Sequence, residues 1–212
     1  MNVGILGSGA VAQTLASGFL AHGHAVMLGT RSPAKLKEWS AAHPAAKVGS
    51  VAEAARFGTL LVLAVKGTVA GEVLRSVSAD HLAGKCVIDT CNPIADAPPE
   101  NGVLRFFTTL DDSLMERLQR QFPAARFVKA FSSVGNSLMV DPKVANGPPT
   151  MFICGNDAAA KAEVTGILTE FGWETSDLGQ ATAARAIEPL AILWCIPGFL
   201  RNDWRYAFKV VA

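Results

Sequence analysis

Short apolar runs alternate along this chain with segments in which apolar positions recur at helical spacing. The apolar runs predict strands at residues 3–6, 25–28, 47–48, 60–65, 86–89, 127–131, 150–154 and 173–176. The helical spacing predicts helices at residues 11–21, 33–42, 50–57, 68–77, 112–121, 158–171 and 181–200. Ser32 is the expected N-cap of the second helix, and breaks are expected near Pro189 and at Pro197-Gly198 in the last. Because strands and helices alternate, we expect an α/β fold with a doubly wound, mostly parallel sheet.

The first predicted strand runs directly into a glycine-rich turn that opens the first predicted helix. The turn reads Gly7-Ser8-Gly9-Ala10-Val11-Ala12, a G-x-G-x-x-A version of the dinucleotide fingerprint. Gly7 permits the tight turn, Gly9 lets the backbone approach a pyrophosphate, and Ala12 keeps the helix close to the sheet. Free N–H groups at the helix N-terminus favour phosphate. We therefore predict a Rossmann-type fold that binds a dinucleotide through residues 7–11; the alternative is such a fold that has lost its cofactor.

The end of the second predicted strand carries Thr30, Arg31 and Ser32, and no acidic residue. NAD enzymes usually place Asp or Glu there to bind the ribose 2′-hydroxyl. A guanidinium and two hydroxyls instead suit a 2′-phosphate, and Lys35 lies one helical turn further on. These four residues predict NADP(H) rather than NAD(H). The alternative is that Ser32-Pro33 only caps a helix and that Arg31 is solvated.

The loops after three later strands are candidates for the nicotinamide end, because ligands of open α/β sheets bind beyond the carboxyl ends of the strands. Candidate cofactor contacts there are Val65, Lys66, Asn92 and Pro93. Candidate substrate contacts are Lys66, Asn92, Ser132 and Ser133. For each of them the alternative is a turn residue or a solvated lysine.

Composition narrows the class of protein. Half of the 212 residues are hydrophobic, 17% are charged and the net charge is +1, which excludes disorder and offers no basic field for nucleic acid. The N-terminus lacks the basic and apolar regions of a signal peptide. The most apolar stretch, residues 186–200, is interrupted by Glu188, Pro189 and Pro197 and is shorter than the roughly 20 residues of a membrane span. We expect a cytoplasmic protein without nucleic-acid or membrane partners.

The residues usual in metal and acid–base sites form no recognisable pattern. The four cysteines include no Cys-x-x-Cys pair, and no histidine lies at metal-ligand spacing, so we expect buried cysteines in strands and one helix, and no metal. Neither a Ser-His-Asp nor a Cys-His arrangement is evident. We therefore assign no catalytic side chain; this fits hydride transfer, in which the cofactor and its positioning carry the chemistry.

Several motifs in chain order resemble the coenzyme F420-dependent NADP oxidoreductases and their bacterial relatives. These are Gly7-Ser8-Gly9, Thr30-Arg31, Val128-Lys129-Ala130-Phe131, Cys154-Gly155-Asn156-Asp157, Asp177-Leu178-Gly179 and the run from Ala184-Arg185 through Glu188-Pro189-Leu190-Ala191. The resemblance implies hydride transfer between NADP(H) and a deazaflavin (F420) or flavin (FMN or FAD), a small-molecule redox acceptor, commonly in a homodimer. It also implies a Rossmann domain, residues 1–149, and a small C-terminal α/β extension, residues 150–212, which would complete the substrate cleft and contribute to the dimer interface.

Two departures from the family pattern fall on the acceptor side. Relatives often have Phe-Asn-Thr where this chain has Phe131-Ser132-Ser133, and F420-using members tend to have proline where it has Lys66. Two other functions stay open: a non-catalytic NADPH sensor, and a cyclic-imine reductase resembling pyrroline-5-carboxylate reductase, which needs a longer helical C-terminus. The apolar stretch 186–200 and the aromatic residues after it need a covering surface: the core, a second copy, or a flavin.

Overall fold

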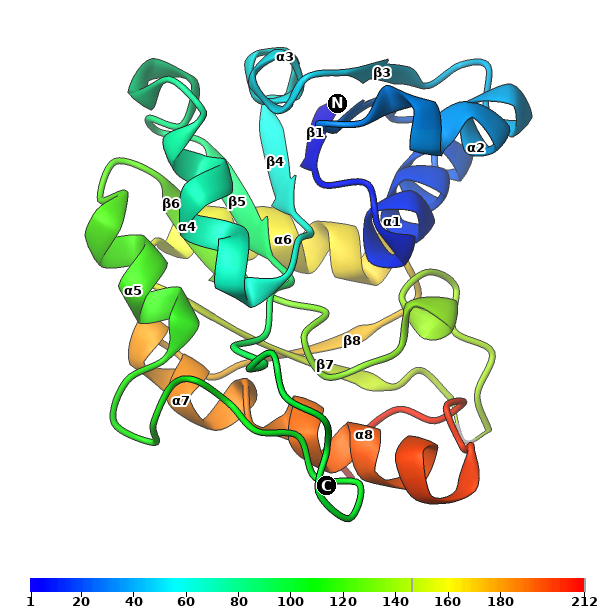
Figure 1. Ribbon diagram of the computed structural model, residues 1–212, viewed down its shortest axis with the longest axis vertical. Coiled ribbons are helices and arrows are strands. Elements are labelled where there is room, and N and C mark those ends of the chain that lie inside the picture. The colour runs from blue at the N-terminus through cyan, green and yellow to red at the C-terminus, as the bar shows by residue number, and fades with distance from the viewer. Residues whose placement is uncertain (146, 212) are drawn as a thin grey trace.

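The computed structural model describes residues 1–145 and 147–211 and contains one eight-stranded sheet (Figure 1). Its strand order is β3-β2-β1-β4-β5-β6-β7-β8, and every neighbouring pair is parallel except β6 and β7. The strands are β1 (Asn2–Leu6), β2 (Ala25–Gly29), β3 (Lys47–Gly49), β4 (Leu60–Leu63), β5 (Cys86–Asp89), β6 (Arg126–Lys129), β7 (Thr150–Gly155) and β8 (Glu174–Asp177). The predicted doubly wound, mostly parallel sheet is therefore confirmed. The strands β7 and β8 extend the same sheet, while the proposed division at residue 149 stays a prediction.

Helices cover both faces of the sheet. They are α1 (Ala10–Ala21), α2 (Lys37–Ala42), α3 (Val51–Phe57), α4 (Gly67–Arg75), α5 (Leu114–Gln121), α6 (Ala158–Glu170), α7 (Ala184–Ile187) and α8 (Leu190–Arg201), with 3-10 turns η1 (Pro33–Leu36), η2 (Ala79–His81), η3 (Asn136–Leu138) and η4 (Ala181–Ala183). The helices α1 and α6 pack on one face, and α3, α4, α5 and α7 pack on the other.

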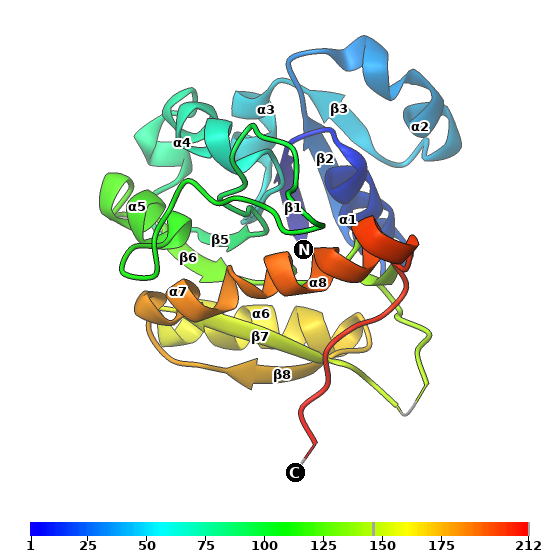
Figure 2. The ribbon, with the colours of Figure 1, turned by 60° about the horizontal axis from the view of Figure 1, so that its bottom comes forward.

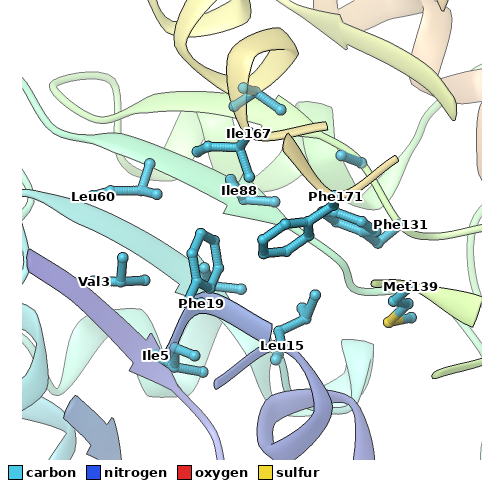
Figure 3. Packing of buried hydrophobic residues seen from close by; sticks show 14 of the residues in the cluster. Val3, Ile5, Leu15, Phe19, Leu60, Ile88, Phe131, Met139, Ile167 and Phe171 are labelled. Atoms are coloured by element: carbon cyan, nitrogen blue, oxygen red, sulfur yellow. The ribbon is translucent and has the colours of Figure 1, made fainter. Parts of the chain in front are cut away.

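Aromatic side chains fill the core between α1, α6 and the sheet. Phe19 and Phe171 lie with their ring centroids 4.9 Å apart, next to Phe131 at the exit of β6 (Figure 3). All three rings are buried. This packing fixes the C-terminal end of α1 on the sheet, and the helix begins at Ala10, directly after the glycine loop.

The start of the second predicted helix differs from the expectation. Residues 33–36 form the 3-10 turn η1, and the Ser32 side chain caps nothing. Instead, the Ser32 N–H donates to the Thr30 hydroxyl at 3.0 Å. The cap prediction is wrong because the Lys35 N–H, which a Ser32 side-chain cap would bind, donates instead to the Ser32 carbonyl at 3.1 Å, the hydrogen bond of a 3-10 turn.

The last helix is more continuous than the sequence pattern predicts. A turn at Glu188-Pro189 separates α7 from α8, as expected, but α8 runs through Pro197 and ends at the left-handed Asn202. Proline leaves the Leu193 carbonyl without its helical donor. The Tyr206 hydroxyl donates to the Trp194 carbonyl and lies 3.5 Å from the Leu193 carbonyl, so a polar group from the following segment reaches this turn of the helix.

The described residues contain one helical stretch long and apolar enough to cross a membrane, by length and composition only. It spans Ala181–Arg201, with a mean hydropathy of 1.4 in its most apolar window. At 21 residues, this helical stretch is longer than the apolar stretch 186–200 identified in the sequence. The stretch also packs on the protein itself: Trp194 is buried and its indole N–H donates to the Tyr206 carbonyl.

Candidate active site

A cavity of about 610 Å³ lies beyond the carboxyl ends of β1, β2 and β4. The residues around it come from four places: the glycine loop, the end of β2, the end of β4 and one side of α4. They are Gly7, Ser8, Gly9, Ala10, Val11, Gly29, Thr30, Arg31, Val51, Ala64, Val65, Lys66, Val69, Glu72, Val73, Ser76 and Thr90. The structure thus brings together all five predicted glycine-loop residues and four of the other predicted cofactor contacts.

The glycine loop has the geometry that a pyrophosphate requires. Gly7 has a φ of +144°, and a methyl group added there would lie 2.1 Å from the Ala64 carbonyl oxygen. At Gly9 an added methyl group would meet no atom of the described chain within 4 Å. The first helical hydrogen bond runs from Gln13 N–H to the Gly9 carbonyl, and no side chain caps α1. The amides of the first turn therefore have no helical acceptor and are available to an anion.

The end of β2 supplies hydroxyl and guanidinium groups to the same cavity. Thr30 is buried, and its hydroxyl donates to the Ser8 hydroxyl at 3.0 Å, which fixes the end of β2 against the glycine loop. Arg31 is 76% exposed and lines the cavity. Ser32 and Lys35 are exposed and lie outside its lining, so their phosphate contacts stay predictions.

A second cavity, of about 430 Å³, continues the first towards β5. The two share Val65, Lys66 and Thr90 in their linings, and Asn92 lines only the second. The start of α4 approaches closely here, since a methyl group on Gly67 would lie 2.1 Å from the Asn92 carbonyl oxygen. Together the cavities form one groove across the carboxyl edge of the sheet, which runs from the end of β2 to the loop after β5.

Two buried polar atoms without partners belong to Asn92, which lines the β5 end of this groove, and to Ser132, which lies behind it. The Asn92 side-chain amide donates to the Ser132 carbonyl at 2.7 Å, while Asn92 Oδ1 and Ser132 Oγ have no hydrogen-bond partner in the described chain. Phe131, just before Ser132, has a φ of +61°, a conformation rare for a bulky residue. Unpaired buried polar atoms are uncommon and indicate a missing ligand or water. Ser132, Ser133 and Pro93 are buried and line neither cavity, so the structure leaves their predicted contacts untested.

The long connection after β5 folds into a short hairpin over residues 93–107, where the sequence pattern predicts neither a strand nor a helix. Isolated bridges join Ile94 to Phe106 and Glu100 to Val103, and its tip has positive φ at Asn101 and Gly102. Residues 94–97 line the second cavity, and Figure 2 shows the green hairpin beside α8. Asn-Gly between paired residues is the turn signal that could have predicted it.

A buried ionic cluster beneath the groove also escaped the sequence interpretation. The Lys129 ammonium lies 2.7 Å from Asp89 Oδ2 and 2.9 Å from Glu188 Oε1, and it donates to the Cys91 carbonyl at 2.8 Å. All three charged side chains are at least 99% buried. Burial acts to lower the pKa of Lys129, but the two carboxylates outweigh it and raise that pKa above its ordinary value.

This cluster connects the C-terminal helices to the groove. Glu188 also accepts hydrogen bonds from Leu114 N–H and Met115 N–H at the N-terminus of α5, at 2.9 and 3.0 Å. Asp89 Oδ1 accepts the Cys91 N–H at 2.9 Å. The ion cluster therefore fixes the backbone just before Asn92, through contacts between segments about 100 residues apart in sequence.

The histidines and cysteines stand apart from the groove's chemistry. His22 and His24 pair with Asp141 and Glu170, and His43 pairs with Ser17. Within the described ranges, no three His, Cys, Asp or Glu side chains are placed to hold a metal. All four cysteines are free; Cys86 and Cys154 lie in strands and Cys195 in α8, whereas Cys91 lies just after β5, and burial raises the pKa of its thiol well above the ordinary value.

Known proteins are similar to this chain in both sequence and fold. The family described as NADP oxidoreductase, coenzyme F420-dependent, matches residues 2–93. A crystal structure of a provisionally assigned F420-dependent NADP reductase from Arthrobacter sp. FB24 is 35% identical, covers 100% of both chains and has a TM-score of 0.93. The chain belongs to the coenzyme F420-dependent NADP oxidoreductase family. The resemblance found in the sequence motifs is thus confirmed, and the protein is placed among NADP-dependent oxidoreductases.

The chain is also similar to two other kinds of reductase. The metalloreductase STEAP3 of Rattus norvegicus is 31% identical over 204 residues, which are 93% of this chain and 38% of that protein. The chain thus spans less than two fifths of its curated relative. A reductive aminase from Aspergillus terreus, solved with NADPH4, is 19% identical, covers 95% of this chain and 62% of that one, and has a TM-score of 0.67; it shares the fold.

Proposed function

We propose that the protein transfers a hydride between NADPH and a deazaflavin or flavin, with the two reacting rings meeting at the β5 end of the groove. The observation that carries this proposal is the pairing of two unlike ends in one groove. One end has a glycine loop and free helix amides. The other end is lined by Asn92, whose Oδ1 is unpaired, and Ser132 with its unpaired Oγ is buried next to Asn92. A dinucleotide with a phosphate-rich middle and an amide-bearing ring matches that order.

At the adenosine end, Arg31 would bind the 2′-phosphate. Its guanidinium lines the cavity, and among residues 1–145 and 147–211 its ion-pair partner is Glu72, at 3.8 Å, which is beyond hydrogen-bond distance. Planar guanidinium groups suit phosphate oxygens. Thr30 would act by holding the β2 end to the glycine loop through Ser8, because its own hydroxyl hydrogen is already donated there.

At the nicotinamide end, the unpaired atoms suit a primary amide. Asn92 Oδ1 accepts a hydrogen bond and Ser132 Oγ donates one, so a carboxamide, which has both an N–H and a carbonyl, satisfies the two together. These contacts would orient the ring that carries the hydride when NADPH is bound. The hairpin at residues 93–107 restricts water on one side of that ring, and Lys66 stands at the rim, 82% exposed, 3.8 Å from Asp96.

The acceptor is tested by absorbance under stopped flow, with NADPH mixed against F420, FMN and FAD. A cyclic imine and a ferric chelate complete the screen, because imine reductases share the fold and a metalloreductase is a relative. We expect fast NADPH oxidation with F420 or a flavin. NADPH oxidation with the imine but with neither F420 nor a flavin would contradict the proposed acceptor and favour an imine reductase. NADPH oxidation with the ferric chelate in the absence of flavin would contradict it and favour a metal reductase. Tight NADPH binding without turnover by any acceptor instead favours the sensor function.

We also propose that the chain works as a cytoplasmic homodimer, without membrane or nucleic-acid partners. Trp194 packs within the chain, but Leu193, Phe199 and Leu200 of α8 are each more than 40% exposed and would be covered by the second copy. Light scattering after size-exclusion chromatography checks the dimer; a monomer at micromolar concentration rejects it. Leu193→Glu is the interface variant, and we expect it to shift the population to monomer.

A further inference from the structure

The cavity of about 610 Å³ is the proposed adenosine end of the groove, and we call it the adenosine cavity. Its wall opposite Arg31 carries one acidic side chain. Four residues of α4 and the turn after it line this wall at helical spacing: Val69, Glu72, Val73 and Ser76. Among the described residues around the cavity, Glu72 is the sole acid, against the two cations Arg31 and Lys66. A carboxylate repels phosphate, so its presence in a cavity suited to phosphate should affect binding.

Glu72 faces the residue expected to read the 2′-phosphate. Its Oε1 lies 3.8 Å from Arg31 Nη1, across the mouth of the cavity between α4 and the end of β2. The side chains are 67% and 76% exposed, so water screens the pair and the bond is easily broken. At 3.8 Å the contact is an ion pair and not a hydrogen bond, which leaves all the guanidinium donors free to turn to a stronger acceptor.

We propose that Glu72 weakens NADP(H) binding selectively, by competing with the 2′-phosphate for Arg31 and by repelling that phosphate. The inference rests on the proposed function only in placing the adenosine phosphate at Arg31. A phosphate bound to Arg31 comes within a few ångströms of the carboxylate, where like charges repel. NADH has no 2′-phosphate and avoids both effects. Glu72 therefore limits the preference for NADPH and hastens release of the oxidised cofactor.

Calorimetric titration of the complete chain tests this without any acceptor. We expect Glu72→Gln to lower the Kd of NADPH and NADP⁺ by roughly threefold to tenfold, because one screened charge contact at this distance has an effect of that order. The Kd of NADH should change by less than about twofold. The gain should shrink as salt is raised, since both competing interactions are electrostatic.

Glu163→Gln in α6 is the matched control, because it changes the net charge equally on a helix that does not line the cavity. We expect it to leave all three dissociation constants unchanged. Combining Glu72→Gln with Arg31→Ala should reduce the gain for NADPH, because only direct repulsion is then left to relieve. Thermal melting of each variant confirms folding.

The two possible failures can be told apart. An unchanged or higher Kd of NADPH in Glu72→Gln, with wild-type NADPH preference intact and lost in Arg31→Ala, overturns the role of Glu72 alone. A wild type with no preference for NADPH, or a preference that survives Arg31→Ala, overturns the proposed placement of the phosphate and the role of Glu72 with it.

Discussion

The cofactor groove and the ion cluster beneath it use charge in opposite ways. In the groove, Arg31 and Lys66 are 76% and 82% exposed, and each lies 3.8 Å from an acidic side chain. In the cluster, Lys129 is fully buried with contacts of 2.7 and 2.9 Å to two carboxylates. Exposed pairs contribute little to stability, whereas removing one member of a buried pair leaves a charge without water or partner.

The difference separates residues that bind ligands from residues that hold the frame. A loosely held cation is free to move to a phosphate, while Lys129 has no free donor direction beyond its carboxylates and the Cys91 carbonyl. We infer that substitutions in the groove change affinity at nearly constant stability. Substitutions in the cluster should change stability first, and activity only as a consequence.

The largest effect is expected at Lys129. Lys129→Met leaves Asp89 and Glu188 buried without their cation, which costs about 3–5 kcal/mol of unfolding free energy. Lys66→Met is the matched control, because it removes the same charge at an 82% exposed position. It should cost less than about 1 kcal/mol. Urea denaturation followed by circular dichroism measures both.

Equal stability losses in the two lysine variants would remove the contrast on which this comparison rests. A Lys129→Met protein that folds normally yet binds NADPH poorly would assign the cluster to ligand binding. Should Lys129→Met not be recovered in soluble form, Glu188→Gln keeps the test available, because it retains the shape of the side chain and one of the two oxygens that accept N–H groups of α5. It should also cost more unfolding free energy than Lys66→Met.

A smaller effect, on affinity alone, is expected at the phosphate loop. Gly9→Ala places a methyl group where no atom of the described chain lies within 4 Å, at an extended φ of −75° and ψ of −177° that alanine adopts freely. It should therefore leave the melting temperature unchanged. It should weaken NADPH binding about tenfold to a hundredfold, as expected when one charge-assisted hydrogen bond is lost.

Gly166→Ala is the control for this substitution. Gly166 is exposed within α6 and also has no neighbour within 4 Å of an added methyl group. The variant should gain up to about 1 kcal/mol of stability from helix propensity and bind NADPH normally. Normal NADPH affinity in Gly9→Ala, measured by fluorescence titration, would show that the pyrophosphate does not approach this loop.

The smallest effect is expected at Glu116, which joins α5 to α7 at the edge of the cluster. It accepts the Ser113 hydroxyl at 2.7 Å and the Arg185 guanidinium at 2.8 Å. Burial raises the pKa of Glu116, but the hydrogen bonds from Arg185 and Ser113 outweigh burial and hold that pKa below its ordinary value. Glu116→Gln should cost about 1–2 kcal/mol at pH 7.

That cost should depend on pH in a fixed direction. A lowered carboxyl pKa means that the ionised form stabilises the fold above about pH 4.3, the ordinary glutamate value, and that this contribution is lost as the pH falls through the lowered pKa. The stability gap between wild type and Glu116→Gln should therefore narrow below pH 4. A gap that widens on acidification contradicts this role.

The sequence predicted those parts of the molecule whose signals are local. The glycine loop was found because its function needs Gly7 and Gly9 at fixed spacing after a strand. The central strand was found because Leu60–Leu63 is apolar on both faces. The capping box of Ser50 and Glu53 likewise starts α3 where a helix was expected.

The parts that were missed depend on partners distant in sequence. Nothing near Lys129 indicates that Asp89 and Glu188 surround it, because those contacts form only when β5, β6 and the last helices assemble. Glu72 was overlooked because its importance comes from lying opposite Arg31 across a cavity. The continuation of α8 through Pro197 was missed as well, and there the Tyr206 hydroxyl, from the following segment, donates to the Trp194 carbonyl.

The most direct test of the cofactor assignment is a paired titration of NADPH and NADH on the wild type and on Arg31→Ala. We expect the wild type to bind NADPH at least tenfold more tightly than NADH, because a guanidinium–phosphate hydrogen bond contributes about 1.5–3 kcal/mol. Arg31→Ala should remove most of that preference while leaving the NADH affinity unchanged. Equal affinity for the two cofactors in the wild type would contradict the assignment.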